Sequence, residues 1–359
     1  MNAPAPNVPK VFKTVNAADL MAGPSAPPVD FVLPGLPAGQ LALLVGADGS
    51  SKSNVALQFG LAKACGIPVA GGLLPAPKAT GRVLYVWGED DIDEAHRRLA
   101  AWTDVAIARG VDPNKIRDGL TNLDFLPLDG ERMPLMAAGR QDSEPKPTEQ
   151  MGILLEAMRG VRLTIIDPMI MFHSLSENDN GHLDTFMRLL IRMARQSGGG
   201  SVLIVHHVGQ EAMLTRRDDH QAGRAGTALA CATRAVWVLR GMGDDEEQAA
   251  GINAGYGRIC GGPKMSRGPK LPGKALRVTD TGVPWFDPDA TKALETLPMT
   301  GGKKRKAGAV GASDKAPKPR RGLANLIGVG SEEFDARAYK QSSQSIEVSR
   351  AGGNNEEDW

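Results

Sequence analysis

The fold of this sequence is decided by the stretch Leu41-Ala42-Leu43-Leu44-Val45-Gly46-Ala47-Asp48-Gly49-Ser50-Ser51-Lys52-Ser53. It opens with an apolar run that predicts a buried strand. A Gly- and Ser-rich loop follows, and a helix is predicted from Ser53 onward. A loop between a strand and a helix turns its backbone amides and the helix N-terminus toward phosphate groups. The stretch therefore predicts a phosphate-binding loop of the Walker A kind.

The side chains of this loop predict ATP and Mg²⁺ as its ligands. Lys52 is expected to reach the β and γ oxygens of the nucleotide, and the hydroxyl of Ser53 is expected to ligate the metal ion. A turn that ends in Lys-Ser by chance is the alternative, and its place between the first strand and helix argues against it. The other predicted nucleotide contacts come from Gly46, Ala47, Asp48, Gly49, Ser50, Ser51 and Asn54.

One position departs from the usual pattern of such loops. Ser51 stands directly before the lysine, where the pattern has Gly and where the chain tends to need a positive φ. A non-Gly residue held in that conformation costs roughly 1 to 2 kcal/mol. Two outcomes stay open: the cost is absorbed by a local shift, or the site binds ATP and hydrolyses it poorly.

Beyond the loop, short apolar runs alternate with helical windows, which is typical of an α/β fold with a mostly parallel central sheet covered on both faces. The predicted strands are 41–45, 83–87, 163–166, 202–205 and 235–239. The predicted helices are 53–65, 91–102, 150–158 and 182–196. In the last helix a spacing of three and four predicts one face that packs on the sheet, made of Leu183, Phe186, Met187, Leu190 and Met193.

Length and composition predict one catalytic domain with flanking segments. With 359 residues, 42% of them hydrophobic and 23% charged, the chain is typical of a soluble globular protein with one good core. We expect an N-terminal arm over 1–28, an ATPase domain over 29–288, and a disordered basic linker with an acidic-tipped tail over 289–359. No apolar run approaches a membrane span, and residues 1–10 lack the pattern of an export signal. A cytoplasmic location is expected.

Acidic residues follow two of the predicted strands. Asp167 ends an apolar strand, and such an end next to the strand of the phosphate loop supplies the oxygen ligand that Mg²⁺ prefers. Glu89 follows the second strand, where RecA-like ATPases carry the residue that activates the attacking water, so it is the predicted general base. The alternatives are that Asp167 only forms a turn, and that Asp90 and Asp91 cap a helix with Glu89 merely nearby.

The fourth predicted strand ends in His206-His207. One imidazole can bond the γ-phosphate or nearby water and report its loss, and the alternation along the strand favours His207. Metal binding is the alternative, although no Cys or further His stands at ligand spacing. The segment 209–225 that follows is polar and basic in its middle, so it predicts either a functional loop facing the channel of a ring or a solvated loop with balanced charge.

Three basic residues beyond that strand are candidates for completing the active site of a neighbouring copy. They are Arg224, Lys264 and Arg267. A basic side chain supplied across an interface stabilises the charge that develops during phosphoryl transfer. The alternative is that all three form surface salt bridges, which contribute little to stability.

Taken in this order, the motifs of residues 27–287 resemble the RepA family of hexameric plasmid replicative helicases, within the wider RecA and DnaB superfamily. The resemblance implies a RecA-like P-loop core, with Arg224 near a subunit interface and Lys264 and Arg267 reaching across it. Gln210 departs from the family pattern, because a Lys often follows the two histidines there. The stretches that carry the resemblance are 27–34, 53–58, Trp87-Gly88-Glu89-Asp90, His96-Arg97-Arg98-Leu99, Ile165-Ile166-Asp167, Val205-His206-His207 and Gln221-Ala222-Gly223-Arg224-Ala225-Gly226.

The function that this resemblance implies is a ring-shaped homo-oligomer, a hexamer, that hydrolyses ATP between subunits. It would translocate on single-stranded DNA as a helicase in plasmid, phage or mobile-element replication. The alternative is an ATP-binding switch, loader or recombination accessory ATPase with weak hydrolysis and no strand separation. An acidic tip with a terminal Trp, residues 354–359, predicts either a docking segment for a replication partner or a solubilising end.

Overall fold

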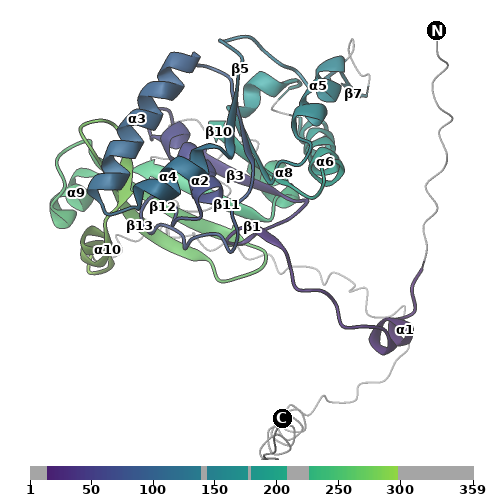
Figure 1. The fold of residues 1–359 in the computed structure, drawn as a ribbon, viewed down its shortest axis with the longest axis horizontal. Coiled ribbons are helices and arrows are strands. Elements are labelled where there is room, and N and C mark those ends of the chain that lie inside the picture. The colour runs from purple at the N-terminus through teal and green to yellow at the C-terminus, as the bar shows by residue number, and fades with distance from the viewer. Residues whose placement is uncertain (1–13, 139–143, 177–178, 208–225, 298–359) are drawn as a thin grey trace, which may run out of the picture. The chain divides into compact units, whose positions relative to one another are not determined.

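A mostly parallel sheet runs through the centre of the protein, with helices on both of its faces (Figure 1). The computed structural model describes residues 14–138, 144–176, 179–207 and 226–297. Within them the central sheet has nine strands. In spatial order they are β14 (Pro284–Phe286), β13 (Leu271–Val278), β12 (Gly257–Met265), β11 (Ala235–Gly241), β3 (Leu41–Gly46), β10 (Ser201–His207), β8 (Leu163–Asp167), β4 (Val83–Trp87) and β5 (Leu123–Pro127).

The remaining elements connect or flank these strands. The helices of the described residues are α1 (Ala17–Ala22), α2 (Lys52–Cys65), α3 (Ile92–Ala108), α4 (Pro113–Leu120), α5 (Glu149–Ala157), α6 (Asn180–Gln196), α8 (Gly226–Ala232), α9 (Asp244–Ala250) and α10 (Pro288–Glu295), with a short 3₁₀ turn η1 (Met169–Phe172). Two small sheets accompany them, formed by β1 (Phe31–Leu33) with β2 (Leu36–Pro37), and by β6 (Met136–Ala137) with β7 (Lys146–Pro147) and β9 (His173–Ser174).

The predicted α/β class is confirmed. From β11 to β5 every neighbouring pair of strands is parallel, and β12, β13 and β14 extend the sheet in antiparallel fashion. All five predicted strands are present as β3, β4, β8, β10 and β11. Helix α3 continues past its predicted end to Ala108, because the fully buried Ala106 extends its apolar face.

Two hydrophobic cores cover the two faces of the sheet. Alternate residues of each strand point to opposite faces, so Leu44 belongs to one core and Leu43 to the other. Helices α2, α3 and α4 fill the first core, and α5, α6 and α8 fill the second. The apolar face predicted for α6 is confirmed, since its five residues are at most 1% exposed. This three-layer arrangement fixes the carboxyl ends of the parallel strands along one edge, where the phosphate loop, Glu89, Asp167 and His207 lie.

The strand that ends in Asp167 does not lie next to the strand of the phosphate loop, so that expectation is wrong. Strand β10 is inserted between β3 and β8 and pairs in parallel with both. Helix α2 bridges the gap, because it crosses the face of the sheet and packs over β8: a Cβ at Gly60 would lie 3.1 Å from the Ile165 side chain. The start of α2 thereby meets the end of β8 across the intervening strand.

The predicted boundary at residue 288 is also too early. Helix α10 begins at Pro288, directly at that boundary, with Asp287 as its N-cap. Its Ala290 is 2% exposed and packs with Ile252 and Ala275 in a small third cluster. The apolar positions of α10 are few, and only this tertiary contact makes the segment part of the folded domain. The rest of the predicted tail, 298–359, with the acidic tip, lies outside the described residues.

Candidate nucleotide-binding site

The phosphate loop lies between β3 and α2, and its backbone takes the conformations that the motif requires. Ser51 has φ 71° and ψ 27°, and Gly49 also has φ 71°. A Cβ at Gly46 would lie 2.5 Å from the carbonyl oxygen of Leu239, so a side chain there would force the sheet or the loop to shift. The positive φ predicted at Ser51 is confirmed. A non-Gly residue in this conformation costs roughly 1 to 2 kcal/mol in general.

Lys52 is the first residue of α2, and its ammonium group folds back onto the loop. Nζ donates a hydrogen bond of 2.6 Å to the carbonyl oxygen of Ala47, and the residue is 5% exposed. Burial lowers the pKa of this ammonium group, while the charges of Asp48, Asp167 and Glu89 oppose that shift. The ammonium group of Lys52 is thus held at the N-terminus of α2. Its positive charge and the helix dipole both favour the binding of an anion such as phosphate there.

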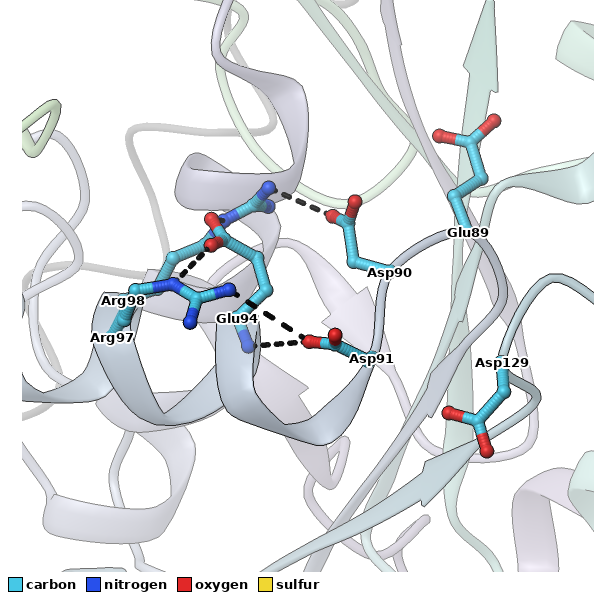
Figure 2. Close-up of a pocket in the computed structure, with 7 residues that line it drawn as sticks. All are labelled: Glu89, Asp90, Asp91, Glu94, Arg97, Arg98 and Asp129. Atoms are coloured by element: carbon cyan, nitrogen blue, oxygen red, sulfur yellow. Dashed lines mark hydrogen bonds and ion pairs between the residues drawn. The ribbon is translucent and has the colours of Figure 1, made fainter.

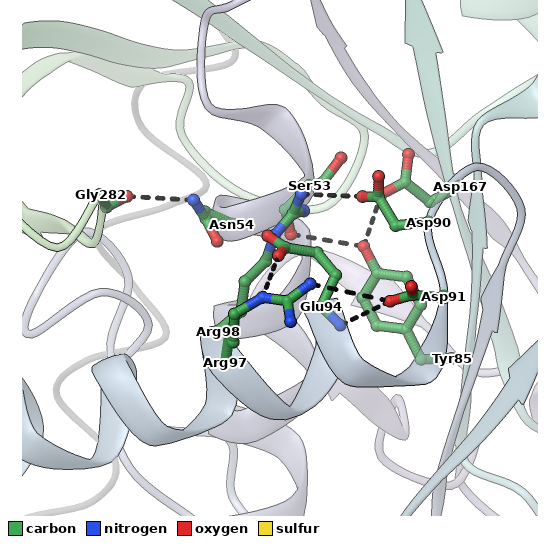
Figure 3. A network of polar contacts seen from close by, with 10 residues as sticks. All are labelled: Ser53, Asn54, Tyr85, Asp90, Asp91, Glu94, Arg97, Arg98, Asp167 and Gly282. Carbon is green, nitrogen blue, oxygen red and sulfur yellow. Dashed lines mark hydrogen bonds and ion pairs between the residues drawn. The ribbon is translucent and has the colours of Figure 1, made fainter.

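Ser53 and Asp167 meet where α2 begins and β8 ends (Figure 3). Oδ2 of Asp167 accepts a hydrogen bond of 2.5 Å from the hydroxyl of Tyr85, and Oδ1 is buried without a hydrogen-bond partner among the described residues. Burial raises the pKa of this carboxyl group, and the side chains of Tyr85 and Ser53 oppose the shift. A buried, unpartnered carboxylate oxygen beside a hydroxyl fits a hard cation such as Mg²⁺, which prefers oxygen ligands.

Glu89 lies in the turn between β4 and α3, and its two acidic neighbours are engaged elsewhere. Asp91 is the N-cap of α3, because its Oδ1 accepts from the backbone N–H of Glu94 at 2.8 Å. Asp90 forms an ion pair of 2.8 Å with Arg98. Figure 2 shows the side chain of Glu89 extending away from both contacts. Of the three acids only Glu89 lines the pocket beside the phosphate loop. The alternative is right that Asp91 caps the helix and wrong that Asp90 does.

Strand β10 places its two histidines in different surroundings. His206 is 7% exposed, whereas His207 lines the pocket beside the phosphate loop. Nδ1 of His207 forms a hydrogen bond with Oδ1 of Asp48, and this contact lowers the pKa of the Asp48 carboxyl group. In the described part of the chain no group of three or more His, Cys, Asp or Glu side chains is arranged to hold a metal ion. The geometry therefore puts His207 at the phosphate loop, as strand alternation predicts.

His206 gives the stability of the fold a pH dependence. Burial lowers the pKa of its imidazole to about 4 from its ordinary value of 6.5, so the unfolded chain binds a proton that the folded chain excludes. The free energy of unfolding is expected to fall by about 3 kcal/mol as the pH drops from 6.5 to 4. Urea unfolding of wild type and His206→Asn across this range measures the difference. Equal pH slopes in the two proteins would contradict the prediction.

The predicted loop residues and two later elements meet in one pocket. Gly46, Ala47 and Ser50 form the inner side of the loop, where Oγ of Ser50 donates to the carbonyl oxygen of Ala47 at 2.7 Å. Asp167 lies behind Ser53 at the buried end of the site. The pocket itself is lined by Asp48, Gly49, Ser51, Lys52, Ser53, Asn54, Glu89, Arg98 and His207.

Two predicted basic residues lie far from this pocket. Lys264 pairs in register with Val236, near the start of β11, and its Nζ donates to the carbonyl oxygen of Ala230. Arg267 lines a different pocket with Gln40, which precedes the first residue of β3. The phosphate loop follows the last residue of that strand, and six residues of a strand span about 20 Å. Neither side chain lines the pocket of the phosphate loop in its own subunit. Arg224 lies outside the described residues.

Sequence reasoning missed three residues that contact this site. Tyr85 bonds Asp167, Arg98 lines the pocket, and a guanidinium nitrogen of Arg258 donates to the carbonyl oxygen of Gly49 at 3.3 Å. The spacing of Glu94 and Arg98 by four residues could have revealed their helical ion pair. No local pattern points to Tyr85 or Arg258, because each reaches the site from a strand distant in sequence.

The comparison with protein families gives the class of this molecule. A model of the AAA domain family matches residues 6–213, which is more than half of the chain. The chain belongs to this family, and with its phosphate loop and α/β sheet it is a P-loop ATPase. The match ends before β11, so it does not include Lys264 or Arg267. None of the helices that the structure describes is both long and apolar enough to cross a membrane.

Several solved structures are similar to this chain at low identity. The RadB recombinase matches with a TM-score of 0.41 and 16% identity, covering 68% of this chain and 90% of its own. A second solved structure, an ATPase domain, matches with a TM-score of 0.46 and 14% identity, covering 70% and 87%. A KaiC-like protein from Pyrococcus horikoshii matches with a TM-score of 0.44 and 14% identity, covering 73% and 100%. Similarity at this level says nothing about the activity of this chain.

Proposed function

We propose that this protein is an ATP-driven, ring-shaped DNA helicase or translocase of the RepA type. The observation that carries the proposal is a division of the catalytic groups. The phosphate loop, Asp167, Glu89 and His207 share one end of the sheet, whereas Lys264 and Arg267 lie at the other end. A site divided in this way is complete only where two copies meet head to tail, and such contacts form a ring when the rotation between neighbours closes. The sequence resemblance supports a hexamer.

The proposed reaction is the hydrolysis of ATP between subunits. Lys52 and the loop amides hold the phosphates, and Ser53 and Asp167 would hold Mg²⁺, which neutralises charge on the phosphate oxygens when bound. Glu89 accepts a proton from the attacking water. His207, which bonds Asp48 here, would exchange that partner for the γ-phosphate. A neighbour's Lys264, Arg267 or Arg224 stabilises the charge of the transition state.

Single-stranded DNA as the partner is supported by the motifs that resemble the RepA family. The test is ATP hydrolysis with and without single-stranded DNA, together with strand displacement on a forked duplex. We expect DNA to stimulate hydrolysis and the fork to be opened, and Lys52→Ala to abolish both. Because backbone contacts by basic residues dominate such binding, the stimulation should weaken as salt rises. Hydrolysis without any response to DNA would contradict the helicase proposal.

The second candidate, an ATP-binding switch or loader with weak hydrolysis, is favoured by Ser51. Its φ is 71° in the folded loop. The cost of this conformation, roughly 1 to 2 kcal/mol, therefore lowers the stability of the folded loop and does not add to the barrier to hydrolysis. We therefore expect Ser51→Gly to change the rate of ATP hydrolysis by less than about tenfold. Steady-state hydrolysis by wild type and Ser51→Gly decides between the candidates. A much larger gain in the hydrolysis rate of Ser51→Gly would show that Ser51 slows hydrolysis in the natural protein, which would favour the ATP-binding switch.

A further inference from the structure

Arg98 lies between the phosphate pocket and a neighbouring acidic cluster, and the proposed reaction gives it no task. Its side chain is 22% exposed and lines the pocket of the phosphate loop. It also lines the adjoining pocket drawn in Figure 2, which it shares with Glu89, Asp90, Asp91, Glu94, Arg97 and Asp129. A half-buried cation at this position needs a reason, because its charge loses part of its hydration.

Three contacts fix the guanidinium group of Arg98 in place. One terminal nitrogen donates to Oδ2 of Asp90 at 2.8 Å, and Nε donates to Oε1 of Glu94 at 2.7 Å (Figure 3). The group also lies over the ring of Trp87, 4.9 Å from its centroid. A planar guanidinium can lie flat over a ring while its edge donates to two carboxylates in fixed directions, a geometry that a compact ammonium group does not reproduce. The contacts are therefore specific to Arg at this position.

The residues that Arg98 contacts lie before and after Glu89 in the chain. Trp87 and Asp90 lie on either side of the Gly88-Glu89 step, and Arg98 holds both from helix α3. Asp91 is fixed in turn as the N-cap of that helix. The backbone that carries Glu89 is thus tied to α3 on both sides. The Glu89 side chain points away from these contacts (Figure 2) and lines the pocket of the phosphate loop.

We infer that Arg98 is a positioning residue, which holds the β4–α3 turn so that Glu89 faces the phosphate pocket. The inference rests on the proposed function, in which Glu89 is the general base. Without Arg98 the carboxylates of Asp90 and Glu94 lose a shared cation and repel each other, so the turn relaxes. A displacement of about 1 Å at a reacting group can cost about 100-fold in rate.

The test compares five variants of the full-length chain with wild type. We expect Arg98→Ala, Arg98→Lys and Asp90→Asn each to lower kcat, by up to about 100-fold, because each removes or weakens the ion pair of Arg98 with Asp90. The affinity for a non-hydrolysable ATP analogue should change by less than about threefold, since the phosphate loop is untouched. The double variant Arg98→Ala/Asp90→Asn should be no slower than the slower single variant. Arg97→Ala is the matched control, because Arg97 is 65% exposed, does not line the phosphate pocket, and should leave kcat unchanged.

Hydrogen exchange of residues 88–91 gives a readout that needs no hydrolysis. Loss of the contacts that Arg98 makes with Asp90 and Trp87 should speed amide exchange of these residues in the Arg98 and Asp90 variants and not in Arg97→Ala. Unchanged exchange, or recovery of kcat by Arg98→Lys, would overturn the inference. So would a loss of nucleotide affinity in Arg98→Ala with normal kcat in Asp90→Asn, because Arg98 would then contact the phosphates directly. Thermal melting identifies any variant that fails to fold, and the isosteric Asp90→Asn then decides.

The two proposals fail in different ways. Wild type without ATP hydrolysis, alone or with DNA, would overturn the proposed function, and the exchange measurement would still decide whether Arg98 holds the turn. Wild type with normal hydrolysis and fully active Arg98→Ala and Asp90→Asn variants would overturn only the inference about Arg98.

Discussion

Replacing Lys264 and Arg267 together by Ala is expected to lower the rate of ATP hydrolysis by about 10³ to 10⁵-fold, the effect of removing a basic residue supplied in trans. Both residues lie toward the amino-terminal ends of β11 and β3, away from their own phosphate loop, so under the proposed function they act on a neighbour's nucleotide. Nucleotide affinity should change far less than kcat, because the loop that binds the phosphates is intact. Steady-state hydrolysis and equilibrium nucleotide binding measure the two effects.

Mixing subunits tests the trans arrangement directly. Neither Lys52→Ala nor the Lys264→Ala/Arg267→Ala variant should hydrolyse ATP alone. In a random equal mixture about one interface in four joins an intact phosphate loop to intact basic residues, so activity should return in part. Lys270→Ala, an exposed cation close to Arg267, is the matched control and should remain active. If the mixture stays inactive although the subunits co-assemble, Lys264 and Arg267 do not act across an interface.

Replacing Glu89 by Gln is expected to lower kcat for ATP hydrolysis by about 10² to 10⁴-fold, the usual contribution of a general base. Gln keeps the size and hydrogen-bonding shape of the side chain but cannot take a proton from water. The ion pair of Asp90 with Arg98 and the helix cap of Asp91 do not involve Glu89, so the fold and nucleotide affinity should be preserved. Single-turnover hydrolysis together with binding of the ATP analogue separates chemistry from affinity.

Asp129 provides the matched control for Glu89. It is another acid of the adjoining pocket, and it does not line the pocket of the phosphate loop. Its φ is 48°, a conformation that Asn also tolerates, so Asp129→Asn should fold normally and keep its rate of hydrolysis. A normal rate in Glu89→Gln beside a large loss in Asp129→Asn would assign the base to Asp129 instead.

Five of the six parallel strands and the phosphate loop could be read from local patterns, whereas the edge strand β5 was not predicted. Strands β3, β4, β8, β10 and β11 are short apolar runs because both of their faces are buried, and such runs need no knowledge of their neighbours. The positive φ at Ser51 follows from the motif alone, since a loop that wraps phosphate must turn there. The choice of His207 over His206 follows from the strict alternation of side chains along a strand.

The antiparallel strands were not predicted, for a physical reason. Strand β12 contains Gly261, Gly262 and Pro263, and β13 contains Pro272 and Gly273, so neither has the apolar pattern of an isolated strand. Their pairing with β11 and with each other stabilises them, and pairing is a property of the assembled sheet. The same pairing carries Lys264 and Arg267 away from the phosphate loop of their own subunit.

Local sequence thus defined which groups could do chemistry: a phosphate loop, acids at strand ends, a histidine and scattered basic residues. Tertiary structure decided which of them meet. The insertion of β10 between β3 and β8 and the bond from Tyr85 to Asp167 join segments distant in sequence through strand order and packing. Such contacts form only when distant parts of the chain offset their loss of conformational freedom together, and no window of neighbouring residues contains that information.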